Sequence, residues 1–177
     1  MKNLNKKGFT LVELLAVIVV LALIMVLTVP SVLTSMNSAR QSSFLLYAGK
    51  MIESAQGKYQ SQLLIGVPAT CYSLESLSDN ASTQYSGTVQ VTYDENNTPI
   101  FKIQMYDKSY QIGFKADPTG DNVKPLGDKA GGVTYAEIEN IKRNLAEASL
   151  KPAPTSAELE ADAAKTADEK VYVVTCE

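Results

Sequence analysis

An apolar segment close to the amino terminus constrains this 177-residue chain more than any other feature. Between Phe9 and Val29 the only charged side chain is Glu13, and the other residues are aliphatic side chains, methionine, phenylalanine and threonine. A run of about 20 apolar residues is long enough to cross a bilayer as a helix. A carboxylate inside such a run costs about 2.5–3.5 kcal/mol on insertion scales, so it needs a partner or a function. The sequence therefore predicts a membrane helix that carries one functional acid.

The residues that open this segment carry a family resemblance. A short basic leader ends in Gly8, and the next five residues read Phe-Thr-Leu-Val-Glu, from Phe9 to Glu13. This pattern resembles the class III signal of type IV pilins and pseudopilins. The resemblance implies that a prepilin peptidase cuts between Gly8 and Phe9 and methylates the new amino terminus on Phe9. It also implies an assembly role for Glu13 and for Pro30, which matches a helix proline common in that family.

Two ordinary export signals are the alternatives to this interpretation. A signal anchor also places basic residues before an apolar run, and a cleaved secretory signal has a small-residue site after it. No such site stands out between Thr28 and Ala39. Neither alternative explains a glutamate so soon after Gly-Phe, although Glu13 could lie at the headgroup level without a role. The pilin-like interpretation is therefore favoured.

The charge distribution predicts the orientation and limits the partners. The formal net charge is -3, and removing the leader lysines Lys2, Lys6 and Lys7 takes it to about -6. An acidic chain has little long-range attraction for nucleic acid or anionic lipid, so no direct nucleic-acid binding is expected. The leader lysines would hold the amino terminus in the cytoplasm and leave the carboxyl-terminal part outside. We expect a single-pass protein of the cytoplasmic membrane, in contact with lipid until it assembles at the cell surface.

The cysteines and the absent histidines narrow the chemistry. Cys71 and Cys176 lie far apart in the sequence, and in an exported domain such a pair is typical of a disulfide. Closing a loop of about 100 residues contributes up to about 4.7 kcal/mol in the chain-entropy model. Two free buried thiols are the alternative. Without histidine there is no Ser-His-Asp triad and no histidine-containing zinc site, so an enzyme is not expected.

The helix is expected to continue beyond Pro30. Residues 31–62 contain no second proline, and apolar residues recur there every three or four positions. Pro30 removes one backbone hydrogen bond and is expected to kink or loosen the helix locally. The expected boundaries are the leader 1–8, the membrane and polymerisation helix 9–30, the amphipathic half 31–62 and a globular head 63–177. The apolar stripe consists of Phe44, Ala48, Met51, Ile52, Ala55, Tyr59 and Leu63.

The head is predicted to contain an antiparallel sheet. Residues 88–93, 100–106 and 109–114 alternate between apolar and polar side chains and are joined by short turns, which favours a meander. A small sheet needs a cover to be stable, and the helix stripe would supply it. The other expected elements are a helical turn over 73–77, a helix over 135–150 with Thr134 as N-cap and Glu137 three residues on, a short helix or loose loop over 156–168, and a final strand over 171–174.

These elements make an α+β fold. A long amino-terminal helix, half membrane-spanning and half amphipathic, packs on an antiparallel sheet, and this layout resembles the pilin head. In many members of that family two cysteines bound the carboxyl-terminal region, and Cys71 and Cys176 correspond to them, although their separation here is wide.

One loop could hold a cation. Residues 117–122 read Asp-Pro-Thr-Gly-Asp-Asn and place acidic oxygens around a glycine, but they lack the EF-hand pattern with its closing glutamate. Major pseudopilins of type II secretion hold calcium in a late loop, and their ligands find no match here. A solvated turn is the favoured interpretation. We expect no cofactor, with calcium as the alternative.

The resemblance implies a structural protein. We expect a pilin that a prepilin peptidase and methyltransferase processes, and that membrane assembly machinery polymerises into an extracellular helical filament. Adhesion, motility and DNA uptake are the outcomes that the family implies. Two alternatives stay open: a pseudopilin of a type II secretion or competence machine, and a low-copy minor or tip pilin whose head binds a ligand.

Overall fold

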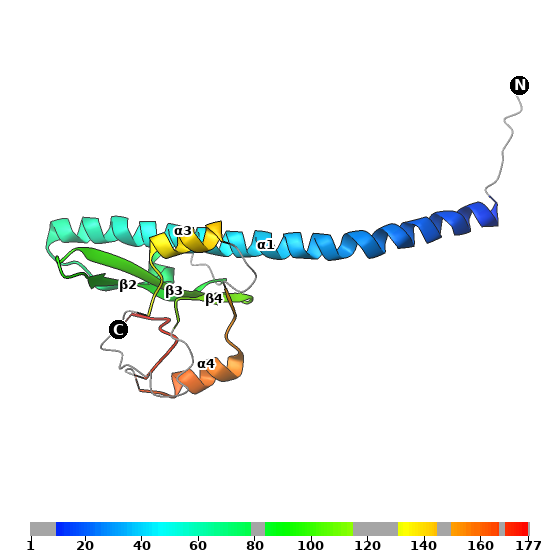
Figure 1. Ribbon diagram of the computed structural model, residues 1–177. Coiled ribbons are helices and arrows are strands. Elements are labelled where there is room, and N and C mark those ends of the chain that lie inside the picture. The colour runs from blue at the N-terminus through cyan, green and yellow to red at the C-terminus, as the bar shows by residue number, and fades with distance from the viewer. Residues whose placement is uncertain (1–9, 79–83, 115–130, 145–149, 167–168, 177) are drawn as a thin grey trace, which may run out of the picture. The chain divides into compact units, whose positions relative to one another are not determined.

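The computed structural model describes residues 10–78, 84–114, 131–144, 150–166 and 169–176. The chain divides into two compact units, residues 1–40 and residues 41–177. Helix α1 (Leu11–Ile65) begins in the first unit and ends in the second (Figure 1). It continues through Pro30, as the sequence predicts.

A sheet forms the centre of the second unit. In the described part of the chain it contains β1 (Cys71–Ser73), β2 (Ser86–Tyr93), β3 (Pro99–Tyr106), β4 (Tyr110–Ile112) and β5 (Lys151–Pro152). The strands follow the order β1-β2-β3-β4-β5, and every neighbouring pair is antiparallel. The predicted meander is therefore confirmed for β2, β3 and β4.

Aspartates close the two turns of this meander. One carboxylate oxygen of Asp94 accepts hydrogen bonds from the backbone amides of Asn96 at 2.9 Å and Thr98 at 2.7 Å. Asp107 does the same for Ser109 at 2.6 Å and Tyr110 at 2.7 Å. A short acidic side chain that bonds the backbone ahead of it stabilises a turn, and this is why the chain reverses at both places.

The second half of α1 covers one face of the sheet, as expected from its apolar stripe (Figure 1). Alternation along β2 and β3 turns one set of side chains toward α1, and the ring of Tyr59 meets the ring of Phe101 edge-on at 5.4 Å. The ring centroids of Phe44 and Tyr110 likewise lie 6.0 Å apart. The buried residues that line this layer are Phe44, Leu45, Ala48, Met51, Ile52, Ala55 and Tyr59 of α1 with Val89, Val91, Phe101, Ile103, Met105 and Ile112 of the sheet.

In the described part of the second unit, three short helices accompany the sheet. Helix α2 (Leu74–Leu77) confirms the helical turn expected near residue 75. Helix α3 (Tyr135–Arg143) starts at the predicted N-cap Thr134, which forms a capping box with Glu137. Tyr135 reaches α1 at Gly49, where an added Cβ would lie 3.5 Å from the tyrosine ring. Helix α4 (Ser156–Ala163) is the short helix expected after residue 155, and Thr155 and Glu158 cap it in the same way.

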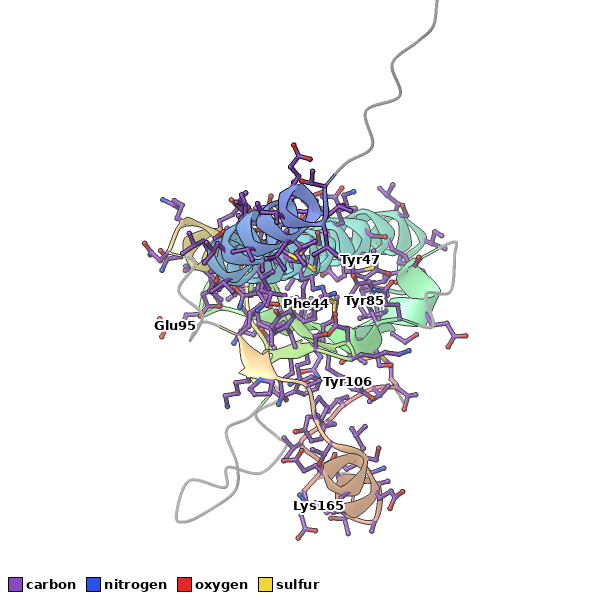
Figure 2. All side chains as sticks on the ribbon, turned by 90° about the vertical axis from the view of Figure 1, so that its right-hand side faces the viewer. Phe44, Tyr47, Tyr85, Glu95, Tyr106 and Lys165 are labelled. Carbon is purple, nitrogen blue, oxygen red and sulfur yellow. A yellow bond between two sulfur atoms is a disulfide. The ribbon has the colours of Figure 1, made fainter. Side chains whose placement is uncertain are left out.

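The layer between the sheet and α4 lies on the side of the sheet away from α1 (Figure 1). It contains the carboxyl-terminal segment, and the rings of Tyr106, Phe114 and Tyr172 pack together there with centroids 4.8–6.2 Å apart. Figure 2 shows Tyr106 on this side, between the sheet and Lys165, whereas Phe44 and Tyr85 lie in the layer under α1. The head thus has a core layer on each face of its sheet.

Four sequence predictions need correction. Leu63 is 56% exposed and does not extend the buried stripe, because α1 runs on to Ile65 beyond the edge of the sheet. The helix from Tyr135 ends at Arg143, since Asn144 leaves helical geometry, and Leu150 precedes β5. The sheet is wider than predicted, because Cys71–Ser73 and Lys151–Pro152 add an edge strand on each side.

The fourth correction concerns residues 171–174, which are not a strand. The amides of Val171 and Tyr172 donate to the carboxylate of Asp162, and the carbonyl of Val173 accepts from the side chain of Thr88. These backbone groups are therefore bonded to side chains instead of to a neighbouring strand. The β-branched residues that suggested a strand belong to an irregular segment that crosses the face of the sheet.

Candidate assembly and processing site

The acid in the apolar segment is held by a capping box at the start of α1. The Glu13 Oε2 atom accepts hydrogen bonds from the Thr10 backbone amide at 2.8 Å and from Thr10 Oγ1 at 2.9 Å, while the Glu13 amide donates to Thr10 Oγ1 at 3.3 Å. This is the reciprocal Thr-x-x-Glu arrangement that satisfies the free amides at a helix start. Within the part of the chain that the structure describes, no donor reaches the second carboxylate oxygen, Oε1.

Thr10 is a site residue that is absent from the sequence predictions above. Its signal is the spacing, because threonine three residues before glutamate at the start of an apolar run is a capping-box pattern. The family resemblance implies a role for the acid alone. The geometry shows that Thr10 orients Glu13.

Three hydroxyl groups near Pro30 bond back to carbonyls of α1. Thr28 Oγ1 donates to the Ile24 carbonyl at 3.0 Å, Ser31 Oγ to the Thr28 carbonyl at 2.9 Å, and Thr34 Oγ1 to the Pro30 carbonyl at 3.1 Å. Proline lacks the amide that would bond the carbonyl one turn earlier, and hydroxyls that bond back to the helix are the usual companions of such a site in an apolar environment. These three hydroxyls are therefore satisfied within the helix when it lies among lipid or other helices.

The outer surface of this stretch is mainly apolar and carries no charge between Glu13 and Arg40. Every residue from 11 to 40 is exposed in the single chain, and no residue between Glu13 and Arg40 is charged. Among the described residues, α1 is the one helix long and apolar enough to cross a membrane. Such a surface is unstable in water unless lipid or another protein covers it.

Gly8 and Phe9, the predicted processing site, lie outside the described residues, so cleavage and methylation there stay predictions. The same holds for residues 117–122, the calcium alternative. In the described part of the chain no group of three or more acidic, cysteine or histidine side chains could hold a metal ion.

Comparison with known protein families identifies the amino-terminal segment. Residues 3–29 match the family described as the prokaryotic N-terminal methylation motif. The chain carries this methylation motif. No curated protein and no solved structure matches the chain.

The motif defines a class of precursor. It is the class III signal peptide of type IV pilins, and it indicates a type IV pilin-like or pseudopilin precursor. It implies processing by a prepilin peptidase and assembly into pilus-like filaments, and it marks a structural protein type that is generally not enzymatic. The apolar helix together with the motif is consistent with membrane anchoring and surface assembly.

The head contains the predicted disulfide. Cys71 in β1 and Cys176 are bonded to each other, with their Cα atoms 5.6 Å apart and a sequence separation of 105. The bond ties the end of the chain to an edge strand. This closes almost the whole head into one covalent loop.

Proposed function

We propose that this protein is a structural pilin, processed by a prepilin peptidase and polymerised into an extracellular type IV filament. The observation that supports this most directly is the methylation motif on a helix whose exposed surface from residue 11 to residue 36 is mainly apolar and carries one charged residue, Glu13. Lipid covers this surface before assembly, and the corresponding helices of other copies cover it afterwards. The head, with its sheet and disulfide, faces the exterior of the filament.

Glu13 has the geometry for a contact between copies. Cleavage after Gly8 gives Phe9 a positively charged α-amino group, and in a bundle of apolar helices this charge lies away from water. An unpaired ion in such surroundings costs several kcal/mol, so a carboxylate from a neighbouring copy stabilises the register in which the two groups meet. The capping box uses Oε2 and leaves Oε1 to accept from that ammonium group.

The leader lysines set the orientation in this proposal. Lys2, Lys6 and Lys7 remain in the cytoplasm, where the peptidase and methyltransferase acts on the Gly8–Phe9 bond, and the head is exported. The membrane assembly machinery then extracts the processed protein from the bilayer. The filament serves adhesion, motility or DNA uptake.

The test separates the charge of Glu13 from its capping role. We expect Glu13→Ala to be inserted, cleaved and folded but to give little or no filament, because the ammonium group of the neighbouring copy loses its partner. Insertion itself should be easier, since a charge is removed from the apolar run. The readouts are the yield of surface filaments and the fraction of mature protein in the membrane.

Thr10→Val is the matched control. It removes the hydroxyl that bonds Glu13 while keeping the side-chain shape and the carboxylate. If the charge of Glu13 drives assembly, Thr10→Val forms filaments. If Glu13 only caps the helix, the two variants fail alike and the proposed contact is wrong. Filaments that stay short even when the protein is overproduced would point to a pseudopilin instead of a pilin.

A further inference from the structure

Residues 171–176, here named the C-terminal strap, cross the face of the sheet that α1 does not cover (Figure 1). The strap is fixed at both ends. Near its start the amides of Val171 and Tyr172 bond to Asp162 in α4, and at its end Cys176 is bonded to Cys71. Between these points the Thr88 hydroxyl donates to the Val173 carbonyl at 3.1 Å.

The carboxylate of Asp162 bonds mainly to the strap. The residue is 3% exposed, and its Oδ1 atom accepts from the Val171 amide at 2.8 Å while Oδ2 accepts from the Tyr172 amide at 2.8 Å. Lys165 lies 3.3 Å from Oδ1 and balances the charge. Among the described residues, two of the three donors to this carboxylate therefore come from the strap itself.

The position of Asp162 would be unfavourable without the strap. It lies in the last turn of α4, where the helix dipole disfavours a negative charge. A buried carboxylate that loses its donors is also strongly destabilising. Bonds to the strap amides offset both the dipole cost and the burial cost of this carboxylate. Asp162 therefore favours the conformation in which the strap lies against the sheet.

The sheet surface under the strap does not hold it by apolar contact alone. Thr88, Gln90 and Gln104 are at most 3% exposed on this face, and the side-chain carbonyl oxygens of both glutamines have no hydrogen-bond partner among the described residues. Burying unpaired acceptors opposes closure of the strap. Tyr172 is the apolar anchor, through its ring contacts with Tyr106 and Phe114. Asp162 fixes the backbone at that same residue.

We propose that Asp162 is a positioning residue for oxidation of the head: it docks the strap before the disulfide exists and so brings Cys176 to Cys71. Cys71 stands opposite Gln90 in the sheet register, on the strap side. In the oxidation one cysteine thiolate attacks a donor disulfide, the second attacks the mixed disulfide, and the new Sγ–Sγ bond forms. The donor takes up two electrons and leaves as two thiols, and both cysteines lose their protons. This role is independent of filament assembly.

The experiment uses the full chain in detergent micelles, reduced and then reoxidised with oxidised glutathione. Quenching with an alkylating reagent at set times and peptide mass spectrometry give the rate of Cys71–Cys176 formation. We expect Asp162→Ala to slow it about tenfold or more, since an undocked chain end meets its partner only through loop closure. Asp162→Asn keeps one acceptor oxygen, and its rate of disulfide formation should lie between those of Asp162→Ala and the unchanged protein.

Asp94→Asn is the control, because Asp94 also accepts from two backbone amides but lies at the β2–β3 turn. The rate of disulfide formation in this variant should equal that of the unchanged protein.

A second measurement reports on docking without oxidation. In the chain carrying Cys71→Ser and Cys176→Ser, the amides of Val171 and Tyr172 should stay protected from hydrogen exchange, and adding Asp162→Ala should remove that protection while the β2–β3 amides stay protected. Equal oxidation rates in the Asp162 and Asp94 variants would overturn the proposal. So would loss of protection at Val171 and Tyr172 in the serine chain that still has Asp162, because the disulfide would then be what docks the strap.

Discussion

At the scale of single residues, two capping boxes in the head repeat the arrangement that holds Glu13. Glu137 accepts from the Thr134 amide and hydroxyl at 2.7 Å each, and Glu158 accepts from Thr155 in the same way. The hydrogen bonds from the Thr134 side chain and backbone lower the pKa of the Glu137 carboxyl, with Lys102 adding to the effect. Because the ionised form is favoured in the folded protein, its contribution to stability is present above the ordinary pKa near 4.5 and is lost as the pH falls through the lowered value.

We therefore predict that Thr134→Ala destabilises the head by about 1 kcal/mol at neutral pH, as is usual for a lost N-cap. The difference should shrink as the pH falls well below 4.5, where Glu137 is protonated and the box is already weakened. Urea unfolding of the unchanged protein and the variant at several pH values measures this. A difference that grows toward low pH would mean that the carboxylate is not what stabilises the cap.

At the scale of elements, the same substitution should reduce the stability of the head strongly on one face of α1 and only slightly on the other. Leu45 is fully buried against the sheet, whereas its neighbour Leu46 is 52% exposed. Leu45→Ala should destabilise the head by about 3–5 kcal/mol, through lost burial and the cavity left behind. Leu46→Ala should change it by less than about 0.5–1 kcal/mol. Similar unfolding free energies for the two variants would contradict the packing described here.

The same packing predicts where the head can be cut from the apolar half of α1. Burial on α1 begins at Gln41, so a fragment that starts at Ser38 keeps the whole stripe over the sheet. A fragment that starts at Leu63 loses it and exposes the sheet face. We expect the first fragment to be a stable monomer and the second to aggregate or unfold. Thermal unfolding and size-exclusion chromatography of the two fragments check this.

The sequence predicts the elements whose pattern is periodic and local. The stripe on α1, the strands near residues 88–106 and the Thr134 cap all follow from spacing and residue type. It does not predict the edge strands Cys71–Ser73 and Lys151–Pro152, because two or three residues carry no measurable period. Nor could β-branched residues at 171–174 reveal that the donors there belong to Asp162, since that pairing depends on how α4 packs.

The candidate site is likewise predicted only in part by the sequence. The position of Glu13 in the apolar run and the leader pattern are readable directly, and the disulfide follows from the presence of two cysteines in an exported head. The sequence does not predict that Thr10 bonds to one carboxylate oxygen of Glu13 and not to the other. That finding comes from the atomic geometry. Local spacing finds the acid, and only the structure shows which of its atoms is available to a partner.

At the scale of the whole molecule, the precursor has two units that require different surroundings. The first unit is an apolar helix that needs lipid or other copies around it, and the second is a disulfide-closed head with its own core. The methylation motif connects them to a pathway of cleavage and assembly. If the motif is used, the leader that holds the lysines is removed before any filament forms.

The amino terminus of the protein recovered from membranes tests this account most directly. Intact-mass and amino-terminal peptide mass spectrometry should show a chain that begins at Phe9 and carries one methyl group on its α-amine, with the Cys71–Cys176 disulfide intact. Replacing Gly8 with a bulky residue such as leucine should leave the leader attached and prevent filament formation. A mature chain that begins at Met1, or at a site beyond Val29, would contradict the account.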